Sequence, residues 1–406
     1  MTMHVLGRPG IARRLAKTFA TVGAVTAVLV GMTAFTLPAD AKTHTNTRAN
    51  PHQPTPTYTV RTILSGHSLR HWYTKAGSKV RHSEPLTKPD DITRIGGDLF
   101  TAFQNGVGPQ GQASPAGNRD STVVEFTKSG QVVAQWDIVG KCDGLTANPS
   151  AGLVVATVNE DANSSLYTID PSSGQVVHYS YSRPLPHKGG TDAISFVNGL
   201  MLISASAPGT TGASAPKPFY PAVYVVALNH AKHLALFHAL FFGESHATAA
   251  NGPHFGHPVK LGLTDPDSNE VVPGFEPRFA GDFMLTSQGD KQQIYVNAPN
   301  SKRQHLWVLN LSQSVDDTAW STSWKGAFYA TDNGADTVDV IIGSFWPGTA
   351  FVAVTPCGAN NAPATCPAPG FPGNYLGHLN MFNGQILKVS LRGASLHPQG
   401  LIFAAS

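Results

Sequence analysis

Acidic residues recur at the start of similar short segments, and they are the residues best placed to do chemistry. Each segment has an acidic residue, an apolar stretch, a glycine and a second apolar stretch, as in PDDITRIGGDLFTAF at 89–103 and TDAISFVNGLMLISA at 191–205. The best-aligned acids are Asp91, Asp143, Asp192 and Asp317, with Glu276 as a weaker fifth member. Converging carboxylates repel one another unless they are protonated, hydrogen-bonded or neutralised by a cation. Oxygen-rich sites of this kind suit Ca²⁺ or Mg²⁺.

A structural role is the alternative for these acids, and it is the one we favour. Each aspartate would accept hydrogen bonds from backbone N–H groups in its own turn and so lock the repeat. The sequence alone leaves both roles open.

A second acidic pattern, DPDSNEVVPGFE, occupies 265–276. Oxygen-bearing side chains stand at positions 1, 3, 5 and 12 of a calcium loop, and a backbone carbonyl would come from position 7. These four side chains are Asp265, Asp267, Asn269 and Glu276. Glu270 replaces the usual glycine and Pro273 follows it, so a polar surface turn is the alternative that we favour.

Three further residues are candidates for a ligand cleft. His254 and His257 stand in a Gly-, Asn- and Pro-rich insertion, at a spacing that would suit two metal ligands or a proton shuttle. Trp346 belongs to a late group of tryptophans that could line a cleft for a carbohydrate or an aromatic ligand. A solvent-facing loop and burial between repeats are the respective alternatives.

The elements that would position these residues are short strands in repeating pairs. Apolar strands joined by polar turns occur at 122–136, 166–181 and 377–391, the last with Asn383-Gly384 as a strong hairpin signal. One acidic segment and one hairpin together make four strands, and no amphipathic helix separates the copies. The pattern predicts an all-β fold, a β-propeller of six four-stranded blades, with five to seven allowed, closed by the C-terminal strand.

In this repeating pattern the chain resembles secreted bacterial β-propellers related to the NHL and YVTN repeat families. The resemblance rests on the turn Asp170-Pro171-Ser172-Ser173-Gly174 with Val176-Val177 after it, and on the strand openings Asp143-Gly144-Leu145 and Pro398-Gln399-Gly400-Leu401. More distantly, the chain resembles the six-bladed gluconolactonase-like propellers. That resemblance implies a divalent metal in the central channel, activating an ester or a lactone.

Residues 1–41 predict a signal peptide. A basic start, an uncharged apolar stretch over 18–37 and the small-x-small pattern Ala39-Asp40-Ala41 follow one another in the expected order. A transmembrane anchor is the alternative. Residues 42–57 read as a flexible polar leader, and residues 58–406 as a single propeller domain.

The three cysteines fit an oxidising compartment. Cys357 and Cys366 flank a Pro-containing loop, which predicts a local disulfide. Cys142 is left over, and burial as a small apolar residue is the expected outcome, with pairing to Cys357 or Cys366 as the alternative.

Charge excludes one class of function. The 406 residues include 28 Lys and Arg against 25 Asp and Glu. Removing residues 1–41 takes away four basic residues and one acidic residue, so 24 of each sign are left. A formally neutral chain does not fit a nucleic-acid binder held by phosphate contacts. We expect a secreted monomer without a membrane span after processing.

Three functions are compatible with this sequence. The first is an exported propeller that binds a small molecule or an envelope partner on a loop-rich face. The second is an esterase or lactonase that depends on Ca²⁺ or another divalent metal in an Asp-lined channel. The third is a non-catalytic structural protein of the cell envelope.

Overall fold

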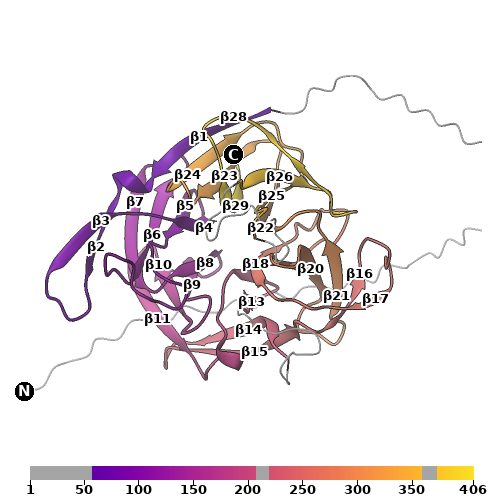
Figure 1. The fold of residues 1–406 in the computed structure, drawn as a ribbon, viewed down its shortest axis with the longest axis horizontal. Helices are drawn as coiled ribbons and strands as arrows, with labels where there is room; N and C mark the ends of the chain where they lie inside the picture. The colour runs from indigo at the N-terminus through magenta and orange to yellow at the C-terminus, as the bar shows by residue number, and fades with distance from the viewer. Residues whose placement is uncertain (1–56, 207–218, 359–372) are drawn as a thin grey trace, which may run out of the picture. The chain divides into compact units, whose positions relative to one another are not determined.

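The computed structural model describes residues 57–206, 219–358 and 373–406, which form antiparallel sheets arranged around a centre (Figure 1). Strand pairing divides these sheets into runs of four strands, each running from an innermost strand at the centre to an outer one. In that order, the first three runs are β4 (Pro89–Ile95), β5 (Asp98–Phe103), β6 (Asp120–Thr127) and β7 (Val132–Val139); β8 (Cys142–Asn148), β9 (Leu153–Val158), β10 (Ser165–Asp170) and β11 (Gln175–Tyr181); and β12 (Ile194–Val197), β13 (Leu200–Ser204), β14 (Pro221–Asn229) and β15 (Leu234–Phe242). The next three are β18 (Pro266–Val271), β19 (Phe283–Ser287), β20 (Gln292–Asn297) and β21 (His305–Asn310); β22 (Val315–Trp320), β25 (Ala350–Val354), β26 (Tyr375–Leu379) and β27 (Ile386–Lys388); and β29 (Pro398–Ala405), β23 (Gly326–Asp332), β24 (Thr337–Ile342) and β1 (Thr57–Ser65).

The first and last strands of the described chain share one sheet. β29 is its innermost strand and pairs with β23, whereas β1 pairs with β24 on the outer side. Chain ends that are distant in sequence are therefore joined by backbone hydrogen bonds. The predicted all-β propeller, closed by its C-terminal strand, is confirmed.

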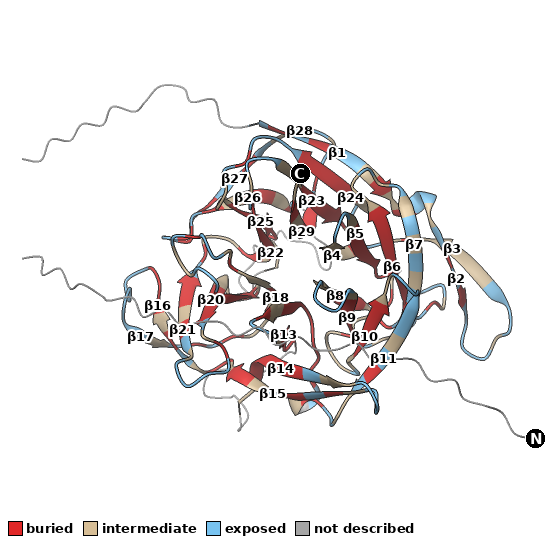
Figure 2. Cartoon of the chain, turned by 180° about the vertical axis from the view of Figure 1, so that it is seen from behind, coloured by how far each residue is buried: buried red, intermediate tan, exposed pale blue. Residues whose placement is uncertain are grey.

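Burial explains why these segments are strands. The middle strands pack on both faces, so β9 and β19 are apolar and buried almost throughout. The outer strand β7 has one solvated face, and its residues alternate between half-buried and exposed over most of its length (Figure 2). Period-two alternation is what a half-buried strand requires.

The inner strands share an irregularity near their starts. Between Cys142 and Leu145, β8 advances three residues while its partner strand advances two. The same register shift occurs in β4, β18, β22 and β29. Just before β12, the backbone of Ser204 bonds to both Asp192 and Ala193. This repeated β-bulge turns a pair of residues out of the regular ladder in each run.

We call these residues the bulge pairs. They occupy equivalent positions at the start of each inner strand, and their first members are acidic in all but one case. The pairs are Asp90-Asp91, Asp143-Gly144, Asp192-Ala193, Asp267-Ser268, Asp316-Asp317 and Gln399-Gly400.

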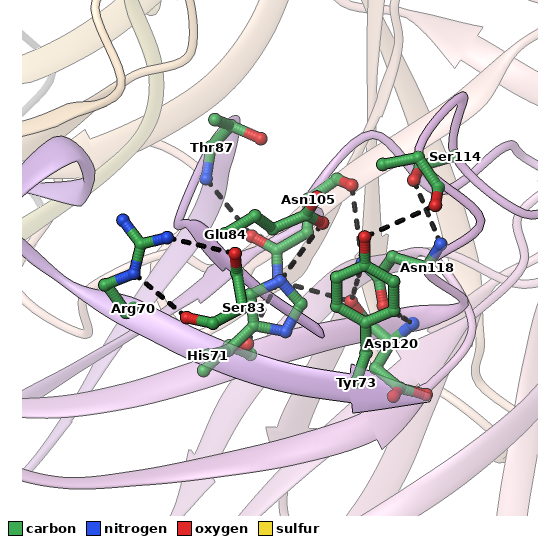
Figure 3. Close-up of polar contacts among 12 residues, drawn as sticks. Arg70, His71, Tyr73, Ser83, Glu84, Thr87, Asn105, Ser114, Asn118 and Asp120 are labelled. Carbon is green, nitrogen blue, oxygen red and sulfur yellow. Dashed lines mark hydrogen bonds and ion pairs between the residues drawn. The ribbon is translucent and has the colours of Figure 1, made fainter. Parts of the chain in front are cut away.

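A hairpin outside these runs, β2 (Arg70–Thr74) and β3 (Arg81–Pro85), lies against the first run (Figure 3). Its buried His71 places Nε2 3.2 Å from Oε1 of Glu84 and Nδ1 3.9 Å from Oδ1 of Asp137 on β7. The Tyr73 hydroxyl donates to the carbonyl of Ala116 at 3.3 Å. The first of these contacts joins the two strands of the hairpin, and the bond from Tyr73 ties the hairpin to the loop before β6. The remaining short elements are η1 (Gly66–Ser68), η2 (Pro186–Lys188), β16 (His246–Ala249), β17 (Pro258–Lys260) and β28 (Ser390–Gly393).

The predicted signal peptide lies outside the described residues, as does the leader except for Thr57. Cys366 also lies outside them, so its disulfide with Cys357 stays a prediction. Cys142 is a fully buried free thiol, as expected. Within the described ranges, the helices are too short to cross a bilayer.

Candidate functional site

A cavity of about 660 Å³ lies between the inner strands. The first members of the bulge pairs all line it, and we call this set the acidic ring: Asp90, Asp143, Asp192, Asp267, Asp316 and Gln399. In total, ten acidic residues line the cavity against two basic ones, Lys88 and Lys141. The cavity extends along the strands to Trp320, Thr322 and Phe403 near their other ends. One end of the cavity is therefore strongly acidic.

The second members of two bulge pairs have a structural role. Asp91 accepts a hydrogen bond from the N–H of Leu145 on the next inner strand at 2.8 Å. Asp317 accepts one from the N–H of Leu401 at 2.6 Å. Each aspartate also accepts a bond from the residue that follows it. Asp91 and Asp317 therefore have a structural role, but they join neighbouring inner strands and do not only close their own turns as we expected.

Asp143 belongs to an ion-pair network instead. Its Oδ1 lies 2.6 Å from Nζ of Lys141 and accepts a bond from Nε2 of Gln104 at 2.9 Å. Lys141 also pairs with Glu160. Burial, followed by the charge of Glu160, raises the pKa of Asp143 to about 7. Burial lowers the pKa of Lys141, but Asp143 and Glu160 more than reverse this, so the lysine stays charged.

Asp192 and Asp267 form a carboxyl pair across two neighbouring runs. Burial raises the pKa of both groups well above its ordinary value. The contact between the two side chains also acts on the pKa of each, so the two carboxyl groups titrate as a pair. One proton shared by two carboxyl groups is the expected result where like charges cannot both ionise.

Burial raises the pKa of the other acids of the cavity as well. It is the first cause that raises the pKa of Asp265 to about 6, of Asp316 to about 7 and of Glu270 to about 8. It also raises the pKa of Asp90, Asp91 and Asp317 well above the ordinary value. Nε2 of Gln288 donates to Asp316 at 2.6 Å, which partly offsets the effect of burial. The cavity therefore changes its charge between weakly acidic and weakly basic pH.

Some buried oxygen atoms at the cavity have no hydrogen-bond donor among the described residues. They belong to residues at most 9% exposed: Oδ2 of Asp143, Oδ1 of Asn269 and Oε1 of Gln399. The orientation of the Asn269 amide is set by its Nδ2, which donates to the carbonyl of Ala193 at 2.6 Å. Each of these atoms is an acceptor that lacks a donor or a cation.

The donor set does not form the divalent-cation centre that the acidic pattern suggests. Oxygen ligands are what Ca²⁺ and Mg²⁺ take. Asp143 is, however, engaged with Lys141, and Asp192 with Asp267. Over the described ranges, no three His, Cys, Asp or Glu side chains stand in an arrangement that could hold a metal ion. The residues as placed do not fit a preformed metal centre.

The segment predicted as a calcium loop has a different structure. Residues 266–271 form the inner strand β18, so neither the wrapping loop nor the polar surface turn that we favoured is correct for these residues. The polar residues of this strand line the channel and contact the neighbouring inner strand. The cavity brings together Asp265, Asp267 and Asn269, but not Glu276.

The predicted ligand-cleft residues lie elsewhere. His254 and His257 are exposed in the turn between β16 and β17, and Trp346 is exposed in the turn after β24. None of the three lines the cavity. The structure does not bring them together in one cleft with the acidic ring.

The sequence did not reveal several residues of the site. Asp90 and Asp316 each precede a predicted ring member by one position, and the bulge explains this offset. Lys141 and Glu160 come from the segments before β8 and after β9, and nothing in their spacing predicts an ion pair with Asp143. Gln399 was part of the C-terminal strand opening and could have been found by aligning that opening with the acidic ones.

Comparison with known proteins concerns the fold alone. No protein-family model matches the chain, and no curated protein matches it. Among solved structures, the periplasmic gluconolactonase of Pseudomonas aeruginosa is similar at 12% identity and a TM-score of 0.41, over 87% of this chain and 99% of that one. A luciferin-regenerating enzyme is similar at 10% identity and 0.36, over 72% and 95% of the two chains. A protein of unknown function from Desulfotomaculum acetoxidans is similar at 10% identity and 0.33, over 83% and 100%.

Proposed function

We propose that the protein is an exported, monomeric binding protein whose central cavity takes a small, positively charged ligand. Buried acceptors without donors, at Asp143, Asn269 and Gln399, are the observation that supports this most. Leaving a buried polar group unsatisfied costs about 1–3 kcal/mol. A ligand that brings N–H donors or positive charge would remove that cost.

The charge of the cavity favours a cation over an anion. Ten acidic residues line it, and Lys141 is already neutralised by Asp143 and Glu160. A concave site with one sign of charge concentrates ligands of the opposite sign. An anionic ligand would be repelled by each lining carboxylate that is ionised, whereas a cation would stabilise the ionised form of these acids.

The size of the cavity favours an organic ammonium compound. Small-molecule sites usually enclose about 300–1,000 Å³, and the present cavity of about 660 Å³ lies in that range. A bare divalent ion would fill only a small part of it. A polyamine can place ammonium groups against several acids at once, and a divalent ion is the other source of the same charge.

Thermal unfolding in the presence of defined cations tests this proposal. We expect spermidine and tetramethylammonium at pH 7.5 to raise the Tm of the full chain more than CaCl₂ or MgCl₂ does, because a ligand that binds only the native state stabilises it. The double variant Asp192→Asn/Asp267→Asn should lose most of the shift, whereas Asp98→Asn at the start of β5 should keep it. No shift with any of the four cations, or equal shifts in both variants, would overturn the proposal.

Ester or lactone hydrolysis is a second candidate, favoured by the Asp192–Asp267 pair. A protonated and an ionised carboxyl group in contact provide an acid and a base. The Asp192 carboxylate would take a proton from water as the water oxygen bonds to the carbonyl carbon. Asp267 would give its proton to the alkoxide that leaves when the C–O bond breaks.

Hydrolysis of δ-valerolactone and p-nitrophenyl acetate tests this candidate. Activity that is lost in Asp192→Asn and Asp267→Asn but kept with EDTA would support the carboxyl pair. Activity lost with EDTA would instead support the metal-dependent esterase predicted from the sequence. If the wild type hydrolyses neither substrate faster than Asp192→Asn/Asp267→Asn does, both the carboxyl-pair mechanism and the metal-dependent mechanism are excluded.

A further inference from the structure

Two exposed tryptophans form a pair on the surface beyond the non-acidic end of the cavity. The rings of Trp324 and Trp346 have centroids 4.3 Å apart and are tilted by 60°. They are 57% and 67% exposed, which is unusual for so large an apolar side chain. Trp320 and Thr322, which line that end of the cavity, precede Trp324 by a few residues. The expectation that the late tryptophans are buried between repeats is therefore wrong for this pair.

Rigid turns hold the pair in place. The Thr349 N–H donates to the carbonyl of Trp346 at 3.0 Å, with Pro347 and Gly348 between them. Gly348 has a φ of +92°, so the turn has the Pro-Gly order of a type II turn. Ser321 is hydrogen-bonded to this turn from the segment that carries Trp324. The two rings are thus presented by backbone that is already ordered.

A buried carboxyl group without a donor lies beside the same turn. Glu276 is 6% exposed, and its Oε1 has no hydrogen-bond partner among the described residues. A Cβ built on Gly348 would lie 2.8 Å from that oxygen, so the carboxyl group abuts the turn directly. Burial raises the pKa of Glu276 to about 7. Phe275, 54% exposed, precedes it.

We propose that Trp324, Trp346 and Glu276 form a binding site for a pyranose unit of a glycan. A pyranose ring presents one face of C–H groups, which stacks on an indole face, and hydroxyl groups at its edge, which donate to a carboxylate. The segment that carries Trp324 is polar, with Ser321, Thr322 and Ser323 before the ring and Lys325 after it. Two rings in polar surroundings suit a sugar better than a protein, because stable protein interfaces need a much larger patch.

The site is separate from the proposed cation site and does not depend on it. The tryptophans and Glu276 are not among the residues that line the cavity. A glycan site on this face would hold an exported protein at a polysaccharide of the cell envelope. Such a site would explain how the protein could act as a structural protein of the cell envelope, the third function that the sequence left open.

Titration of the full chain with cellohexaose and chitohexaose, followed by tryptophan fluorescence, tests the proposal. Binding to at least one of them is expected, together with depletion of the protein from solution by insoluble cellulose or chitin. Trp324→Ala and Trp346→Ala should each weaken binding at least about tenfold, since each removes a stacking surface. Trp72→Ala, which removes an equally exposed tryptophan on β2, should leave binding unchanged.

Glu276 supplies a second measurement. Glu276→Gln retains a carbonyl acceptor and should bind within about threefold of the wild type, whereas Glu276→Ala should bind at least about tenfold more weakly. Absence of wild-type binding to both oligosaccharides and both polysaccharides would overturn the proposal. Equal binding by the wild type and the variants at Trp324 and Trp346 would also overturn it. The cation-dependent Tm shift is unaffected by either result.

Discussion

The side-chain carboxyl group of Asp91 on β4 accepts a hydrogen bond from the backbone N–H of Leu145 on β8 at 2.8 Å. Asp317 and Leu401 repeat the relationship between β22 and β29. A carboxyl group that bonds to the backbone of the next inner strand holds two neighbouring runs of strands together. The acids next to them, Asp90 and Asp316, line the cavity as well.

Removal of either joining carboxylate should destabilise the protein. Asp91→Ala and Asp317→Ala each leave a buried N–H on the next strand without its acceptor, at a cost of about 1–3 kcal/mol. Urea unfolding measures this as a lower transition midpoint. Asp98→Ala, an acid without such a bond, should change the midpoint much less, and equal effects in all three variants would contradict the assigned role.

Two glycines of the bulge pairs should be intolerant of any side chain. A Cβ on Gly144 would lie 2.3 Å from the carbonyl oxygen of Asp192, and one on Gly400 would lie 2.5 Å from that of Asp90. Backbone atoms of the next run cannot yield easily, so Gly144→Ala and Gly400→Ala should each cost about 1–3 kcal/mol. Gly274→Ala, whose Cβ meets nothing within 4 Å, is the control in the same urea measurement.

Stability of the ligand-free protein should fall as the pH rises from 5 to 9. Asp143, Asp316 and Glu270 have pKa values of about 7, 7 and 8, above the ordinary values of about 4. The native state therefore binds more protons than the unfolded state between these limits, and its stability decreases with pH. The contribution is complete below about pH 4 and lost above about pH 8.

Tm measured across this range checks the direction. Asp316→Asn removes one titrating group and should flatten the curve, whereas Asp98→Asn should not. A Tm that rises with pH in the ligand-free protein would contradict the protonation of the acidic ring.

Cys142 should be chemically inert in the native protein. It is fully buried, and burial raises the pKa of its thiol well above the ordinary value. Because the thiolate is the reactive form, iodoacetamide should label Cys142 only after unfolding. Peptide mass spectrometry of native and urea-treated samples measures this, and rapid labelling of the native chain would contradict the burial.

The fold could be predicted because its signals are local and repeated. The hairpins at 122–136 and 166–181 show alternation or apolar runs bounded by turn residues, and these became β6–β7 and β10–β11. The position of β29 as the strand that closes the propeller could be predicted because its first residues resemble the starts of the other inner strands. The β2–β3 hairpin and the outer position of β1 were not predicted, because pairing over such a sequence separation leaves no local pattern.

The site could be predicted only in part. All four acids of the predicted ring line the cavity. Asp91 and Asp317 are the second members of their bulge pairs, however, and they also bond to the backbone of the next inner strand. β18 was missed because Asp267, Asn269 and Glu270 give it no apolar signal. The Lys141 network depends on contacts between segments that follow different strands, which no single-sequence pattern reports.

Calorimetric titration with spermidine and with CaCl₂ at pH 7.0, in two buffers of different ionisation enthalpy, is the sharpest test of a cation site in the cavity. A cation that enters a cavity of partly protonated acids must lower their pKa values and displace about one proton or more. We therefore predict buffer-dependent heats with net proton release for the wild type, and neither for Asp192→Asn/Asp267→Asn. Absence of binding heat for both cations, or binding without proton release, would contradict the proposed cation site.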